Sequence, residues 1–116
     1  MAIIDWALFN ENFQYYDSGV INEVIGIFID EYDQRIAALE KNIDEKDFIN
    51  LAFNAHSLKS VISNYMAPRA LDLTSRLEEM ARSKMDEGLY ENFTELKIVT
   101  QELLSELRNY LQRIRN

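Results

Sequence analysis

The chain has 116 residues, 47% of them hydrophobic, with 12 basic and 20 acidic side chains and a formal charge of −8. This size provides one core and little room for a second, so we expect residues 1–116 to form a single domain. The negative charge argues against nucleic acid and anionic membranes as partners, and the lack of cysteine excludes disulfides, thiolate zinc sites and cysteine nucleophiles.

Residues 1–17 form an aromatic-rich leader. With only three glycines and one proline among many strong helix formers, the whole chain is predicted to be all-α. The leader is therefore expected to be a short helix that packs across an end or a side of the helices that follow. Its aromatic residues are Trp6, Phe9, Phe13, Tyr15 and Tyr16.

Two long helices are predicted next. The triplet Asp17-Ser18-Gly19 supplies cap and turn chemistry for the first, and the polar cluster at 44–47 ends it. Asp44 or Asp47 then caps the second helix, which is expected to end near Asn64 to Met66. Each helix carries an apolar stripe with spacings of three and four residues: Ile21, Ile25, Phe28, Tyr32, Ile36, Leu39 and Ile43 in the first, and Phe48, Leu51, Ala55, Leu58, Ile62 and Tyr65 in the second.

Two further helices complete the chain. Pro68 fits the first turn of the third helix, where its missing N–H is no loss, and Asp86-Glu87-Gly88 ends that helix. Their inward faces comprise Leu73, Leu77, Met80 and Ala81 in the third helix, and Phe93, Leu96, Thr100, Leu103, Leu107, Tyr110 and Ile114 in the fourth, which starts at Leu89. Four amphipathic helices with short polar connections predict an antiparallel four-helix bundle over about residues 18–115.

His56 is the only histidine, and it lies on the second helix but off its apolar stripe. Residues three or four apart share a helix face, so this position predicts an exposed imidazole. Apolar groups beside a reactive residue on an acidic surface indicate an interface. We therefore predict a docking surface around His56, made of Ile49, Ala52, Phe53 and Ser63.

The run His56-Ser57-Leu58-Lys59-Ser60 resembles the signature His-x-Leu-Lys-Gly of the histidine-containing phosphotransfer (HPt) domain family. The resemblance extends to Ala67-Pro68-Arg69 and to the Leu77-Glu78 pair, over a bundle pattern from about residue 20 to 115. Ser60 and Met66 stand where the family usually has glycine. Because glycine takes a positive φ at a helix end, we expect a differently shaped turn at Met66, with Asn64 as the substitute.

The resemblance implies a phosphoprotein of a two-component system, in which His56 carries a phosphoryl group between receiver-domain aspartates. The family attacks through Nε2, and imidazole, with an ordinary pKa of about 6.5, keeps a neutral nucleophilic fraction at cytoplasmic pH. Lys59 and Ser60 are the residues expected to stabilise the phosphoryl group. The expected partners are a response-regulator receiver domain and a hybrid sensor histidine kinase.

No cofactor and no metal site are expected on the chain itself. It has no glycine-rich nucleotide loop or Walker motif, so we expect a carrier without ATP-dependent kinase activity, and any Mg²⁺ is expected on the receiver. No apolar run approaches the roughly 20 residues of a membrane span, and the N terminus lacks a basic region before an apolar stretch. We therefore expect a cytoplasmic protein, and we expect a monomer because the apolar seams of a four-helix bundle face one another.

The main alternative is a degenerate HPt-like domain or helical adaptor that binds partners without phosphotransfer. The replacements at Ser60 and Met66 keep it open, and mutation of His56 discriminates, because a pure binder tolerates the loss of the imidazole. A di-iron bundle is excluded, since one histidine cannot supply paired Glu-x-x-His motifs. A phosphatase requires an acid or amide beside His56, and the sequence identifies none.

Overall fold

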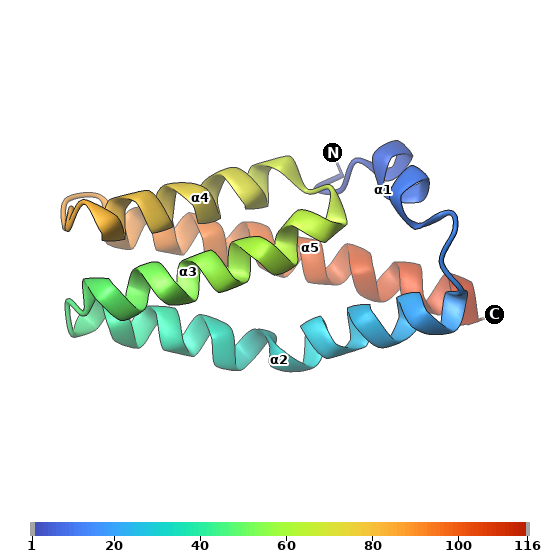
Figure 1. The fold of residues 1–116 in the computed structure, drawn as a ribbon, viewed down its shortest axis with the longest axis horizontal. Coiled ribbons are helices and arrows are strands. Elements are labelled where there is room, and N and C mark those ends of the chain that lie inside the picture. The colour runs from blue at the N-terminus through green and yellow to red at the C-terminus, as the bar shows by residue number, and fades with distance from the viewer. Residues whose placement is uncertain (1, 116) are drawn as a thin grey trace.

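The computed structural model describes residues 2–115 and is all-α, as predicted. No β-strand occurs within these residues. The elements are α1 (Trp6–Phe13), α2 (Ser18–Asp44), α3 (Phe48–Ile62), the short 3₁₀ helix η1 (Ser63–Tyr65), α4 (Pro68–Arg82) and α5 (Leu89–Arg115). Figure 1 shows α2 to α5 side by side and alternating in direction, so the predicted antiparallel bundle is the arrangement observed.

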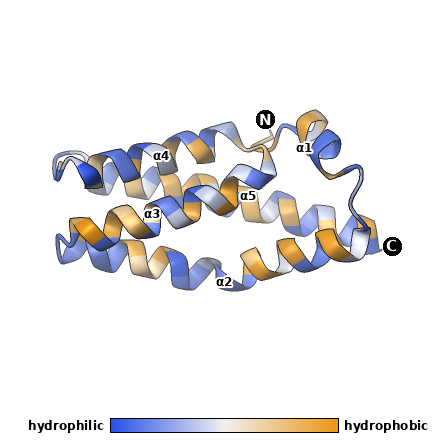
Figure 2. Cartoon of the chain, in the orientation of Figure 1, coloured by the Kyte–Doolittle hydropathy of each residue, from blue (hydrophilic) through white to orange (hydrophobic). Residues whose placement is uncertain are grey.

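The four predicted apolar stripes meet in one core. Leu51, Leu58, Leu77 and Leu103 are fully buried, and the buried set runs along the whole length of α2 and α5. Hydrophobic and hydrophilic bands alternate along these helices in Figure 2, as expected of amphipathic helices. Burial of the stripes is therefore the main force that sets the helices beside one another.

The helix ends follow the predicted cap chemistry. The Asp17 carboxylate accepts a hydrogen bond from the Gly19 N–H at the start of α2. Asp47, and not Asp44, caps α3: it accepts from the Asn50 N–H, while Asp44 is the last residue of α2. Pro68 is in the first turn of α4. The Asp17 and Asp47 carboxylates each satisfy a backbone donor that the first helical turn leaves without a partner, whereas Pro68 has no such donor.

The leader packs across one end of the bundle, as expected. Phe9 of α1 is fully buried, with its ring centroid 4.9 Å from that of Tyr110 on α5. The Asp5 N–H donates to the Met66 carbonyl oxygen at 2.8 Å, and the Asn12 amide donates to the Asn64 carbonyl oxygen at 3.3 Å. The leader is thus joined both to α5 and to the turn that follows α3.

The predicted change of turn at Met66 is wrong. Met66 itself adopts the left-handed conformation, with φ 54° and ψ 48°, whereas Asn64 belongs to η1. Lys46 after α2 and Lys84 after α4 have the same φ of 54°. A left-handed residue without glycine costs about 1–2 kcal/mol, so this chain accepts that strain at three turns.

α2 and α5 are much longer than the two helices between them. Each has 27 residues, against 15 for α3 and for α4. At 1.5 Å per residue, these lengths correspond to about 40 Å and about 22 Å. Four helices therefore lie together only around the level of His56, while at the other end α2 and α5 continue toward α1 (Figure 1).

None of the helices across residues 2–115 has both the length and the apolar character needed to cross a membrane.

Candidate functional site

His56 lies in the middle of α3 with its imidazole directed outward. Its side chain is 56% exposed, while Ala55 and Leu58 on the opposite face are fully buried. The apolar stripe of α3 thus fixes the helix against the core and leaves the ring accessible. The predicted exposure of His56 is confirmed.

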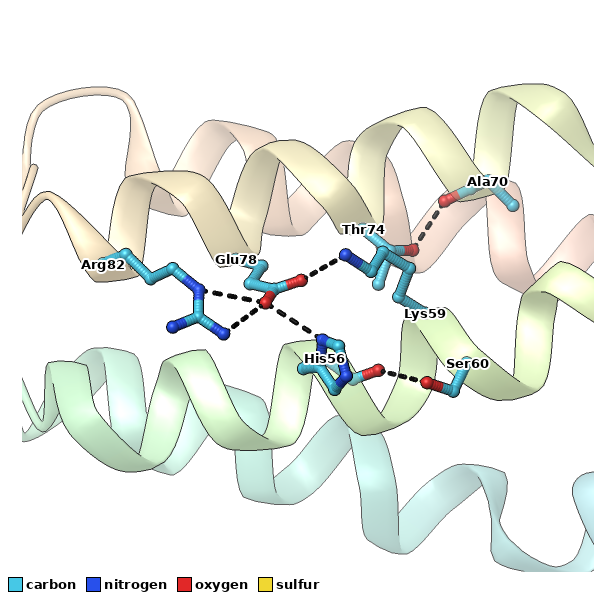
Figure 3. Close-up of polar contacts among 7 residues, drawn as sticks. All are labelled: His56, Lys59, Ser60, Ala70, Thr74, Glu78 and Arg82. Carbon is cyan, nitrogen blue, oxygen red and sulfur yellow. Dashed lines mark hydrogen bonds and ion pairs between the residues drawn. The ribbon is translucent and has the colours of Figure 1, made fainter.

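Glu78 of α4 binds the inner edge of the imidazole. Its Oε2 lies 3.0 Å from His56 Nδ1, across the α3–α4 contact (Figure 3). The Glu78 side chain is only 7% exposed, although it carries a carboxylate. A buried carboxylate requires cationic or hydrogen-bonding partners.

Two cations supply those partners. Lys59, one turn after His56, places Nζ 2.6 Å from Glu78 Oε1. Arg82, one turn after Glu78, donates to Oε2 from Nη2 at 2.6 Å and from Nε at 3.0 Å. Figure 3 shows these side chains converging on Glu78 from both helices. We call His56, Lys59, Glu78 and Arg82 the Glu78 network.

The network keeps Glu78 ionised. Burial by itself raises the pKa of this carboxyl, but contacts with Lys59, Arg82 and His56 outweigh burial and lower the pKa to about 2. At neutral pH the carboxylate therefore has no proton to donate. The proton in its contact with the imidazole belongs to Nδ1, and in the neutral ring Nε2 is left with a free lone pair.

Ser60 and Ser63 lie on the exposed face, but their hydroxyl protons are directed into α3 itself. Ser60 Oγ donates to the carbonyl oxygen of His56 at 3.1 Å, and Ser63 Oγ donates to that of Ser60 at 2.7 Å. Lys59 contacts the same carboxylate as His56, whereas Ser60 makes no contact with the imidazole ring among the bonds of residues 2–115.

The predicted docking residues separate into two kinds. Ile49 and Phe53 are 80% and 72% exposed, and Ser63 is exposed as well. Ala52 is only 8% exposed, so its predicted place on the outer face is wrong. It lies on the edge of α3 that packs toward α4. A helical wheel of α3 alone does not show burial by a neighbouring helix.

Ala52 contributes instead to a groove of about 310 Å³ between α3 and α4. Phe48 and Ile49 contribute apolar groups to its lining, and Arg82 of the Glu78 network contributes a cation. A groove with both apolar and cationic lining residues therefore lies on the N-terminal side of His56. The groove lining is Phe48, Ile49, Ala52, Ala81, Arg82 and Lys84.

Sequence reasoning missed the roles of Glu78 and Arg82. Two signals were present: a carboxylate directly after Leu77 at the edge of an apolar stripe, and an arginine four residues later. The acid beside His56 that the sequence did not identify is Glu78, and its oxygens are engaged by the imidazole and two cations. It therefore fits the role of a ring-orienting group better than that of a base acting on water.

Residues 2–115 contain no group of three or more histidine, cysteine, aspartate or glutamate side chains placed to hold a metal ion.

The family model of the Hpt domain matches residues 23–116. The chain belongs to the Hpt domain family. Hpt domains are phosphocarriers of phosphorelay signalling, which work with receiver domains and kinases and are not ATP-dependent kinases themselves. The match begins inside α2, so α1 and the first turn of α2 lie outside it. No curated protein and no solved structure gives a significant match to the chain.

Proposed function

We propose that this Hpt domain is a phosphorelay carrier in which Nε2 of His56 receives a phosphoryl group from a receiver aspartate and passes it to another. The observation that supports this most directly is the contact between Glu78 Oε2 and His56 Nδ1. It holds the proton on the inner nitrogen and directs the unprotonated nitrogen outward. A nucleophile in a fixed tautomer is what an in-line displacement at phosphorus needs.

The transfer balances without an external base. The Nε2 lone pair forms the N–P bond while the P–O bond of the aspartyl phosphate breaks, and the carboxylate of the receiver leaves. The proton on Nδ1 stays in place. The ring becomes cationic as the new bond forms, and the ionised Glu78 stabilises that charge, as a carboxylate does for a catalytic histidine elsewhere. The reverse sequence returns the group to a second receiver.

Lys59 is our candidate for stabilising the phosphoryl oxygens. Its side chain is about one-third exposed, and it reaches the same carboxylate as His56. A modest rotation away from Glu78 brings its charge toward a group on Nε2. Ser60 contributes a hydrogen bond only if its hydroxyl leaves the His56 carbonyl, so we assign it the smaller role.

The receiver docks, in this proposal, on the exposed apolar surface beside His56. Ile49 and Phe53 supply exposed area, Ala52 lines the groove, and Ser63 extends the surface toward the end of α3. Apolar residues at the centre of an interface exclude water from a transfer reaction. We expect Mg²⁺ to be supplied by the receiver, and the domain to act in the cytoplasm as a monomer.

Intact mass spectrometry tests the proposal. The chain is incubated with a phosphorylated receiver, and the product is checked for the acid lability and base stability of phosphohistidine. Wild type is expected to gain one phosphoryl group, His56→Gln none, and ¹⁵N-histidine NMR to place it on Nε2. The control is Asn50→Gln, at an exposed position of α3 away from the Glu78 network.

The alternative of a binding module makes the opposite prediction. Wild type then binds several competent receivers without gaining mass, and His56→Gln binds them equally well. Modification at Nδ1 would also overturn the proposal, because that nitrogen is the one that Glu78 holds.

A further inference from the structure

A second exposed apolar surface lies on the first half of α2. Val20, Val24 and Ile27 are 46%, 40% and 52% exposed, and their spacing of four and three residues places them on one helix face. We call these three residues the α2 stripe. Single exposed apolar residues are ordinary on a protein surface, whereas an aligned set over successive turns is typical of a binding face.

The α2 stripe lies on the edge of α2 that faces α3, but beyond the point where α3 ends. Ile27, Glu31 and Arg35 are spaced four residues apart and therefore share one face of α2. On that face, Arg35 donates a hydrogen bond to the Ser57 hydroxyl of α3 at 2.9 Å. After α3, Tyr65 of η1 stacks on Phe28, with ring centroids 5.3 Å apart. Ten residues of α2, from Ser18 to Ile27, or roughly 15 Å, continue past this level (Figure 1).

The charge around the α2 stripe is mainly negative, although Arg35 on the same edge lies 3.7 Å from Glu31. Between residues 2 and 34 the sequence has seven acidic residues and no lysine or arginine, so this segment carries most of the net charge of −8. Three of these acids, Glu23, Asp30 and Glu31, are exposed on the same turns as the stripe. Arg115 of α5 reaches α2 at Asn22, which is on the opposite edge of the helix.

We propose that the α2 stripe binds a basic amphipathic helix of a partner protein, laid along α2 where α3 has ended. The apolar side of that helix covers Val20, Val24 and Ile27, and its lysines or arginines pair with the acids beside them. About three helical turns fit along this length. A second copy of the chain is a poorer occupant, because it presents the same acidic face and like charges repel. The proposal is independent of phosphotransfer.

The test uses a labelled synthetic leucine–lysine helix of about four turns, titrated into the full chain and followed by fluorescence anisotropy. Changing Val20, Val24 and Ile27 together to serine is expected to weaken binding at least about tenfold. Ile98→Ser is the matched control, since Ile98 is 54% exposed on α5 and outside the stripe. It is expected to bind as wild type does, and so is His56→Gln.

Charge is tested separately. Glu23→Lys with Glu31→Lys leaves the stripe intact and is expected to weaken binding and reduce its salt dependence. In ¹⁵N-amide spectra, the shifts caused by the peptide are expected to concentrate in residues 18–31. Circular dichroism and urea midpoints establish that the variants, all at exposed positions, are folded.

Three results overturn the proposal. The serine variant binds the peptide as tightly as wild type, or a scrambled peptide of the same composition binds equally well. Alternatively, sedimentation equilibrium finds a dimer of the wild-type chain that the serine variant abolishes, which assigns the stripe to self-association.

Discussion

The surroundings of His56 and the leader end of the bundle hold their side chains in place by different means. Around His56, a single buried carboxylate is held by an imidazole and two cations. At the leader end, aromatic rings pack on one another, with Phe9 4.9 Å from Tyr110 and Phe13 6.4 Å from Tyr65 between ring centroids. Electrostatics orients an exposed ring in one region, and buried area fixes the helices in the other.

The difference has a consequence for pH. The Glu78 carboxyl titrates with a pKa lowered to about 2, so acid dismantles the network that orients His56. At the leader end, burial raises the pKa of the Tyr65 hydroxyl to about 12, so that group stays neutral across the usual working range. Substitutions in the two regions are therefore expected to differ in which property they change and in how that change depends on pH.

The largest expected effect is the loss of stability in Phe9→Ala. The ring is fully buried and contacts Trp6, Phe13 and Tyr110, so its removal leaves a cavity and is expected to cost about 3–5 kcal/mol. Urea unfolding measures the free energy. The neighbouring Leu8→Ala is the control, because Leu8 is half exposed and its loss is expected to cost less than about 1 kcal/mol. If both variants lose the same free energy of unfolding, the aromatic packing around Phe9 does not stabilise the leader end as proposed.

Glu78→Gln is expected to lower stability at pH 7 by at most about 3 kcal/mol, from the lowered pKa of this carboxyl. Because the pKa of Glu78 is lower in the folded protein than its ordinary value of 4.5, the ionised carboxylate stabilises the fold at pH values above 4.5. This stabilisation is lost as the pH falls toward 2. The stability difference between wild type and Glu78→Gln should therefore shrink over this range. Urea unfolding at several pH values measures it, with the exposed neighbour in Glu79→Gln as control. A difference that stays constant with pH contradicts the ionic role.

Phe53→Ala is the counterpart of Phe9→Ala at the other region. Its ring is 72% exposed, so little stability is lost, but we expect affinity for a cognate receiver to fall about tenfold, or about 1.4 kcal/mol. Calorimetric titration measures the affinity, and Ile98→Ala, at an exposed site on α5, controls for general loss of apolar surface. If Phe9→Ala weakens docking as much as Phe53→Ala while remaining folded, the two regions are not separate in function.

The sequence predicted most of the fold because its helices are strongly periodic. The stripe positions Ile25, Leu39, Leu58 and Leu103 are all fully buried. The Asp17 cap and Pro68 in the first turn of α4 are also where the pattern placed them. Apolar spacing and cap residues each describe a single helix. Predictions from them are reliable where the contacts of a residue come mainly from its own helix.

Features that depend on two helices were harder to predict. The spacing within α3 predicted the exposure of His56 and Phe53 correctly. Ala52 is buried because α4 packs against it, and the pattern of a single helix does not predict such a contact. The contact between Glu78 and His56 joins residues 22 positions apart, and spacing alone does not reveal it. The left-handed Met66 also depends on tertiary context, because its carbonyl oxygen accepts the Asp5 N–H from the leader.

The smallest expected effects are the stability changes caused by glycine substitutions in the left-handed turns at the two ends of the bundle. Lys84 is exposed with φ 54°, so Lys84→Gly relieves strain and is expected to add about 0.5–1 kcal/mol, with Lys84→Ala as the control that keeps it. Met66 has the same φ, but its side chain packs partly buried against the core. Met66→Gly loses that burial and is expected to gain nothing. Urea unfolding of these variants separates backbone strain from packing, and equal gains at both turns would show that the Met66 side chain adds no stability to the leader end.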